Sequence, residues 1–126
     1  SEKYPPASPP PGSRVLVTGA SGGVGVASVL LAKSMHLTVV ALSRSSQKRN
    51  SLKDLGADFL FDPNEPGLVK AIAGTLAPNK LNLVIDSVGG ALLPQLLALL
   101  DYGGRISIVG RSGGPVPELN TASLLF

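Results

Sequence analysis

Aliphatic runs and helical repeats alternate along the chain from Arg14 onward. Runs such as RVLVTGA and LTVVAL are nearly continuous in Val, Leu and Ala, which is typical of strands buried on both faces of a parallel sheet. Between such runs, apolar residues recur at helical spacing, as Leu68, Ile72 and Leu76 do. The predicted strands cover residues 14–20, 37–42, 58–61, 83–85 and 105–109.

The segments between these strands predict four helices. Ser45 is the expected N-cap of the second helix, and Gly56 is expected to close it in a left-handed conformation. Pro94 is expected in the first turn of the fourth helix, where a missing N–H costs least. Gly103 and Gly104 are expected to turn the chain into the last strand. The predicted helices cover residues 23–35, 46–55, a stretch that begins at Pro66, and residues 91–100.

This alternation predicts an α/β fold, a doubly wound parallel sheet with helices on both faces and right-handed crossovers. The expected strand order is 3-2-1-4-5, a Rossmann-type sheet that lacks the sixth strand. Because the fifth strand would then be an unpaired edge, we expect the sequence to be a fragment of a longer polypeptide. Residues 1–12 are Pro-rich and are expected to be a linker, with one domain in residues 13–126.

Composition and charge limit the kinds of partner that we expect. A net charge of +3 is too weak for a nucleic-acid surface, and no apolar stretch approaches the roughly 18 residues that span a bilayer, so neither nucleic acid nor membrane is expected. The absence of Cys fits a reducing compartment, and we expect a cytoplasmic protein. No cluster of His, Cys and carboxylate residues appears, so no metal site is expected.

The stretch LVTGASGGVG joins the first predicted strand to the first predicted helix. Ala20, Gly22 and Gly25 fit the (G/A)-x-G-x-x-G turn that binds dinucleotides, while Thr18 to Gly25 fit the T-G-x-x-x-G-x-G turn of short-chain dehydrogenases. In either register, absent side chains and free N–H groups at a helix start let a diphosphate approach the backbone. The strand–turn–helix context therefore predicts dinucleotide binding.

The end of the second strand indicates which dinucleotide is bound. An NAD site carries an acidic residue there for the ribose, and this turn has none. Arg44 supplies a multi-donor fork and Lys48 a point charge at the expected position of a 2′-phosphate. We therefore expect NADP(H) to be favoured over NAD(H). The remaining cations of this helix are expected on its solvated face: Arg49 and Lys53.

Downstream residues separate the two registers. A short-chain enzyme would show an N-A-G turn after the fourth strand and a Tyr-x-x-x-Lys pair, but neither Tyr4 nor Tyr102 has Lys at that spacing. The chain instead resembles the medium-chain dehydrogenase/reductase superfamily, in its quinone oxidoreductase and enoyl reductase branch. The matching pieces are PGSRVLV at 11–17, ASGGVG at 20–25, LGAD at 55–58, DSVGG at 86–90 and GGR at 103–105.

The resemblance implies where the cofactor lies. The pyrophosphate would sit on the glycine turn, the 2′-phosphate at the end of the second strand, and the nicotinamide and its ribose beside the turns after strands four and five. Asp86 is expected to cap or orient the fourth-strand turn, and His36, where the family usually has Gly, is expected to be structural. The expected cofactor-binding residues are Ser21, Gly22, Gly23, Val24, Gly25, Ser43, Arg44, Ser45, Lys48, Ser87, Val88, Gly89, Val109, Gly110 and Arg111.

The resemblance also implies a function, the NADP(H)-binding domain of an oxidoreductase that transfers hydride to a quinone or an activated double bond. The small-molecule substrate would bind through a catalytic domain absent from this sequence, so the catalytic residues stay unknown and the fragment alone is expected to be inactive. A homodimeric parent is compatible with the resemblance. Two alternatives stay open: the cofactor domain of a zinc-dependent alcohol dehydrogenase, against which Ala20 in place of Gly argues mildly, and a non-catalytic nucleotide-sensing module.

Overall fold

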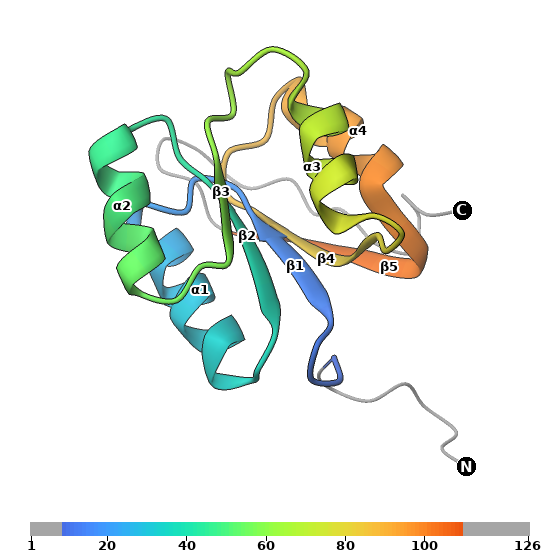
Figure 1. The fold of residues 1–126 in the computed structure, drawn as a ribbon, viewed down its shortest axis with the longest axis horizontal. Coiled ribbons are helices and arrows are strands. Elements are labelled where there is room, and N and C mark those ends of the chain that lie inside the picture. The colour runs from blue at the N-terminus through green and yellow to red at the C-terminus, as the bar shows by residue number, and fades with distance from the viewer. Residues whose placement is uncertain (1–8, 110–126) are drawn as a thin grey trace.

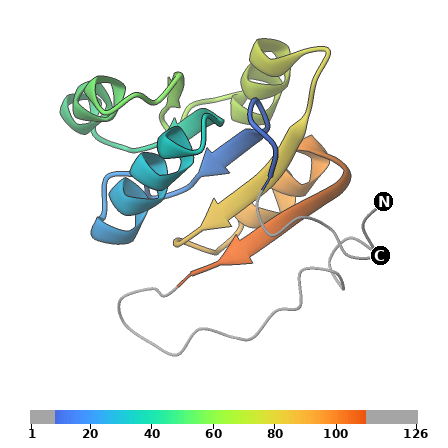
Figure 2. The same cartoon turned by 90° about the horizontal axis from the view of Figure 1, so that it is seen from below.

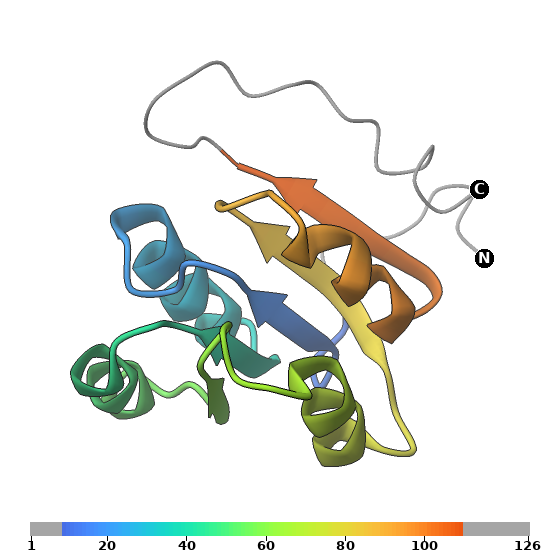
Figure 3. The same cartoon turned by 90° about the horizontal axis from the view of Figure 1, so that it is seen from above.

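Five strands form a single sheet within residues 9–109, the part of the chain that the computed structural model describes. Their order is β3-β2-β1-β4-β5, as the sequence predicts, and each neighbouring pair is parallel. Figure 3 shows β1, β4 and β5 side by side, pointing the same way. The strands are β1 (Arg14–Val17), β2 (Thr38–Leu42), β3 (Phe59–Phe61), β4 (Leu81–Asp86) and β5 (Leu100–Ile108).

Helices cover both faces of this sheet. The first two helices lie on one face and the next two lie on the other (Figure 1). None of the helices in residues 9–109 is both long enough and apolar enough to span a bilayer. The helices are α1 (Gly23–Ser34), α2 (Ser46–Asp54), α3 (Leu68–Leu76) and α4 (Leu92–Leu96), the last followed by the 3₁₀ helix η1 (Leu97–Leu99). The architecture is the predicted α/β Rossmann-type fold.

Two hydrophobic clusters fill the space between the sheet and its helices. Because side chains alternate between the faces of a strand, Val15 and Val17 pack toward α1 and α2, whereas Leu16 packs toward α3 and α4. The predicted apolar stripe of α3, which includes Ile72, is buried in the second of these clusters. Burial on both faces explains why the strands read as continuous aliphatic runs.

Several element boundaries differ from the predicted ones. β1 ends at Val17 because the residues from Thr18 onward form the glycine turn. Pro66 is not the first residue of α3, since Gly67 precedes the helix with a left-handed φ of 70°, which an α-helix cannot contain. The fourth predicted helix divides into α4 and η1, and Leu100 already belongs to β5.

The largest difference concerns β5, predicted at residues 105–109. It begins at Leu100, and its register shifts against β4 before Arg105, which marks a bulge. Gly103 has a φ of 77°, and a Cβ on Gly104 would lie 2.9 Å from a main-chain oxygen of the same bulge. The two glycines therefore form an irregularity inside the strand, not a turn before it. In Figure 2, β5 lies at the edge of the sheet.

The turns at the amino ends of the strands agree with the sequence. His36 has a φ of 62°, the left-handed conformation expected where the family usually has Gly, and its carbonyl oxygen accepts the Gly12 N–H at 2.9 Å. Gly56 ends α2 with a φ of 108°. Both residues lie at the end of the sheet opposite the glycine turn, so they support the fold.

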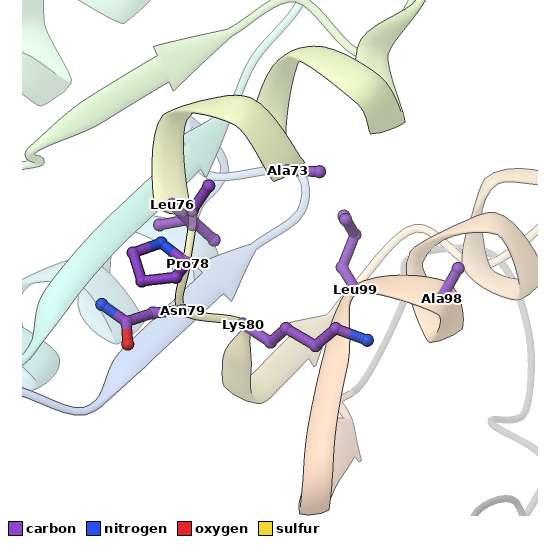
Figure 4. A pocket seen from close by; sticks show the side chains of 8 residues that line it. Ala73, Leu76, Pro78, Asn79, Lys80, Ala98 and Leu99 are labelled. Carbon is purple, nitrogen blue, oxygen red and sulfur yellow. The ribbon is translucent and has the colours of Figure 1, made fainter.

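A small apolar pocket of about 180 Å³ opens at the same amino-terminal end. It lies between the end of α3 and η1, with Leu76 and Pro78 on one side, Leu99 on the other, and Lys80 at its rim (Figure 4). Because these residues precede β4 and β5, the pocket is separate from the carboxyl ends of the strands, where ligands of parallel sheets bind.

Candidate functional site

The glycines of the β1–α1 turn fall into two groups. A Cβ on Gly25 would lie 2.2 Å from the carbonyl oxygen of Gly19, and Gly19 itself has a φ of 55° with Ser87 Oγ only 2.8 Å from its own notional Cβ. A Cβ on Gly22, in contrast, would make one ordinary contact at 3.5 Å, and one on Gly23 would meet nothing within 4 Å. The fold therefore requires Gly19 and Gly25, while Gly22 and Gly23 leave space at the surface of the turn.

The start of α1 offers donors to a ligand. No side chain in the described residues caps this helix, and its first turn contains no acidic residue. The first bond within the helix runs from the Val26 N–H to the Gly22 carbonyl oxygen at 2.8 Å, so the N–H groups of Gly23, Val24 and Gly25 have no acceptor within the helix. Such groups, together with the helix dipole, favour an anion.

The turn after β4 is tied to the glycine turn by a buried pair. Asp86 is 2% exposed, and its Oδ1 accepts hydrogen bonds from Thr18 Oγ1 at 2.8 Å and from the Gly89 N–H at 3.1 Å. Thr18 Oγ1 in turn accepts the Ser87 N–H at 3.0 Å. These bonds confirm the prediction that Asp86 orients the turn, and they hold the two turns in one arrangement.

The turn after β2 carries the predicted hydroxyls and cations. Ser43 is buried, and its hydroxyl donates to Ser21 Oγ at 3.1 Å. Ser45 is the N-cap of α2, as predicted, because its Oγ accepts the Lys48 N–H at 3.2 Å. Arg44 and Lys48 are exposed. Both hydroxyls thus have partners within the protein, while the two cationic side chains extend to solvent.

The prediction that Arg49 lies on the solvated face of α2 is wrong. Only 23% of its side chain is exposed, and its Nη1 donates to the Ser43 carbonyl oxygen at 2.6 Å. The same atom lies 3.9 Å from Asp62 Oδ2. Lys53 is exposed on the same helix, as predicted. The sequence could not show these contacts of Arg49, because Asp62 reaches it only through the pairing of β2 with β3.

A pocket of about 640 Å³ lies at the carboxyl ends of the strands, between these turns. It brings together six of the predicted residues: Ser21, Gly22, Ser43, Arg44, Val88 and Gly89. The sequence reasoning missed the other lining residues: Thr18, Gly19, Leu42, Pro63, Asn64, Ala91 and Leu92. The signal for Pro63 and Asn64 is their place after β3, whose carboxyl end is at the same edge of the sheet. Among the described lining residues, Arg44 carries the charge and none is acidic.

The other predicted residues do not line this pocket. They are Gly23, Val24, Gly25, Ser45, Lys48, Ser87 and Val109. The Val109 N–H donates to the Asp86 carbonyl oxygen at 2.9 Å, which places it next to the turn after β4. Gly110 and Arg111 lie outside the described residues, as does Tyr4.

Metal ligands were not expected from the sequence. Within residues 9–109, no group of three or more His, Cys, Asp or Glu side chains could hold a metal ion. His36 lies at the amino-terminal end of the sheet, away from the pocket. This part of the chain therefore offers no ligand set that fits zinc.

Known proteins match the chain over most of its length. A family model described as zinc-binding dehydrogenase matches residues 23–126. The quinone oxidoreductase of Sus scrofa is 33% identical over 109 residues, which make up 86% of this chain and 32% of that protein. The chain spans about a third of the length of the quinone oxidoreductases and quinone oxidoreductase-like proteins that it matches.

Solved structures share the fold. The quinone oxidoreductase of Escherichia coli, complexed with NADPH, has a TM-score of 0.76 and 28% identity over 91% of this chain and 35% of its own. The CurK enoyl reductase has a TM-score of 0.74 and 31% identity over 85% of this chain and 32% of its own. The chain thus belongs to the zinc-binding dehydrogenase family, in the quinone oxidoreductase-like branch of the medium-chain dehydrogenase/reductase superfamily.

Proposed function

We propose that residues 13–126 form the NADP(H)-binding domain of an oxidoreductase, preceded by a linker in residues 1–12. The observation that carries this proposal is the pocket at the carboxyl ends of the parallel strands, with the open glycine turn on one wall and Arg44 on another. The NADPH complex of the Escherichia coli relative supports the same ligand class. The diphosphate would be held by the turn from Ser21 to Gly25, where Gly22 and Gly23 leave room for it.

Selectivity for the phosphorylated cofactor would come from the turn after β2. Arg44 is an exposed cation at that turn, Lys48 is another in the first turn of α2, and Ser43 and Ser45 add hydroxyls. One charged hydrogen bond contributes roughly 1.5–3 kcal/mol, so a single contact favours NADPH over NADH by about tenfold to a hundredfold. The missing acidic residue removes the usual partner of an NAD ribose.

The nicotinamide end would lie beside the turns after β4 and β5. The residues assigned there are Ser87, Val88, Gly89, Val109, Gly110 and Arg111. The hydrogen bonds of Asp86 and Thr18 would hold the first of these turns in place for the cofactor ring.

The whole protein would transfer hydride to a quinone or an activated double bond, as the names of its quinone oxidoreductase and enoyl reductase relatives suggest. Bound NADPH supplies the hydride, and this chain would bind and orient the cofactor. The small-molecule substrate would be bound mainly by sequence outside this chain, since the relatives are about three times as long.

Side-by-side titrations with NADPH and NADH test the assignment. We expect NADPH to bind more tightly by about tenfold or more, and Arg44→Asp to narrow or reverse this preference because a carboxylate repels the 2′-phosphate. Lys53→Asp is the matched control, since it makes the same charge change at an exposed position of the neighbouring helix. Equal affinities of the wild type for the two cofactors would remove the 2′-phosphate assignment.

A further inference from the structure

Arg49 links two walls of the nucleotide pocket. One wall contains Ser43 and Arg44, at the end of β2, and the other contains Pro63 and Asn64, in the loop after β3. Arg49 does not line the pocket itself. Its guanidinium contacts the residue that begins the first wall and the residue that precedes the second.

The contact with the first wall controls a peptide orientation. Arg49 Nη1 donates to the Ser43 carbonyl oxygen at 2.6 Å, a short bond to a buried residue. Because the peptide is trans and planar, its carbonyl oxygen and the N–H of Arg44 point in opposite directions. While Arg49 holds this oxygen, the peptide cannot turn it toward an anion bound beside Arg44.

The contact with the second wall is an ion pair. Nη1 lies 3.9 Å from Asp62 Oδ2, while Asp62 Oδ1 accepts the Asn64 N–H at 2.9 Å. The Asp62 N–H in turn donates to Glu65 Oε1 at 3.1 Å, so the loop after β3 has internal hydrogen bonds of its own. Through Asp62, the guanidinium therefore connects an ordered loop to the β2 turn.

We propose that Arg49 is a positioning residue that sets the preference for a 2′-phosphate. It does so by holding the Ser43–Arg44 peptide and the Asp62 loop in a fixed position relative to each other. This inference rests on the proposed NADP(H) site. Arg49 acts through Arg44 and the turn, not by touching the phosphate. Both contacts are made by Nη1. This atom lies one bond farther from the main chain than the Nζ of a Lys would, so a Lys at this position would not reach the two partners in the same geometry.

The experiment measures the binding of 2′,5′-ADP and of 5′-AMP to the full chain by calorimetry, because the two ligands differ only in the 2′-phosphate. In Arg49→Lys and Arg49→Met, we expect the Kd for 2′,5′-ADP to rise about fivefold or more, while the Kd for 5′-AMP stays within about twofold. Lys53→Met is the control for lost charge on α2, and we expect it to leave the ratio of the two constants within about twofold. Thermal unfolding is followed in parallel, and Arg49→Lys carries the test if Arg49→Met does not fold.

The outcomes separate the two proposals. If the wild type prefers 2′,5′-ADP and both Arg49 variants keep that preference, Arg49 is not a positioning residue and the proposed function stands. If both constants rise together with a lower unfolding temperature, the role of Arg49 is general stability and this inference is wrong. If the wild type binds neither ligand, the proposed function fails and this inference fails with it.

Discussion

At the scale of single residues, each glycine of the β1–α1 turn is there for one of two physical reasons. Gly25 has main-chain atoms where a side chain would stand. Gly22, in contrast, has a φ of −77°, which any residue adopts, and its Cβ would make only one ordinary contact. The sequence motif contains glycine at both positions and does not show which glycine the fold requires and which one leaves space. Only the second kind of glycine is explained by a ligand.

Substituting these two glycines one at a time distinguishes a role in stability from a role in cofactor binding. We expect Gly25→Ala to lower the free energy of unfolding by about 1–3 kcal/mol or more, because its Cβ would overlap the Gly19 carbonyl oxygen. Gly22→Ala should keep the wild-type stability or gain about 0.4–1 kcal/mol, yet lower NADPH affinity by about tenfold, because its methyl group would occupy space assigned to the diphosphate. Urea unfolding and NADPH titration measure the two effects. Undiminished NADPH affinity in Gly22→Ala would mean that the diphosphate does not approach this residue.

At the scale of elements, side chains hold the turns that follow β1 and β4 together. Thr18 directly follows β1 and Asp86 ends the neighbouring β4, and their hydrogen bond of 2.8 Å is buried. The DSVGG motif at residues 86–90 is typical of the family, but the motif does not show that its Asp faces a Thr from the turn after another strand. The partner is decided by the pairing of β1 with β4, in which Val17 lies opposite Ile85.

Removing the Thr18 hydroxyl tests this arrangement. We expect Thr18→Val to lower the free energy of unfolding by about 1–3 kcal/mol, because the buried carboxylate of Asp86 loses a donor. Ser87→Ala is the comparison, since it removes a hydroxyl that donates to the Thr18 carbonyl oxygen at a less buried position, and it should cost about 1 kcal/mol or less. Urea denaturation of both variants gives the two values. A loss in Thr18→Val no larger than in Ser87→Ala would contradict the assigned role of the buried pair.

At the scale of the whole molecule, one sheet lies between two hydrophobic clusters and contributes side chains to each of them. Val29 of α1 lies in one cluster and Ile72 of α3 in the other, and neither side chain is exposed. The strands between them contribute alternate residues to the two sides. We therefore expect the two helical layers to unfold together. Loss of either layer would expose one apolar face of the sheet to water, and the other layer packs against that same sheet.

Truncation on either face tests this cooperativity. Ile72→Ala should lower the free energy of unfolding by about 2–5 kcal/mol, and Val29→Ala by a smaller amount because it removes one carbon fewer. Each variant should still show one transition, with the same midpoint by circular dichroism and by calorimetry. Two separate transitions in either variant would show that the layers are independent.

The alternation of strands and helices and the place of the glycine turn could be predicted from the sequence alone. The sheet order could be predicted from the Rossmann-type fold that they indicate. The alternation depends on periodicity within segments and on spacing between neighbours, which a single chain displays. Local signals also predicted the N-cap at Ser45 and the left-handed Gly56, because each conformation is decided by the few residues around it. The left-handed His36 was expected from the resemblance, since the family usually has Gly at that position. The bulge of β5 was not predicted, since its glycines have the same local preference in a turn and in a bulge.

The partners that the site's side chains have within the protein follow only from how the strands and helices pack. Arg49 and Lys53 are both cations on one helix, yet Arg49 reaches Ser43 and Asp62 while Lys53 lies exposed. The wall of the pocket at Pro63 and Asn64 likewise depends on β3 pairing with β2. Such contacts join residues that are brought together by the packing of strands, and the pattern of either segment alone contains no record of the other.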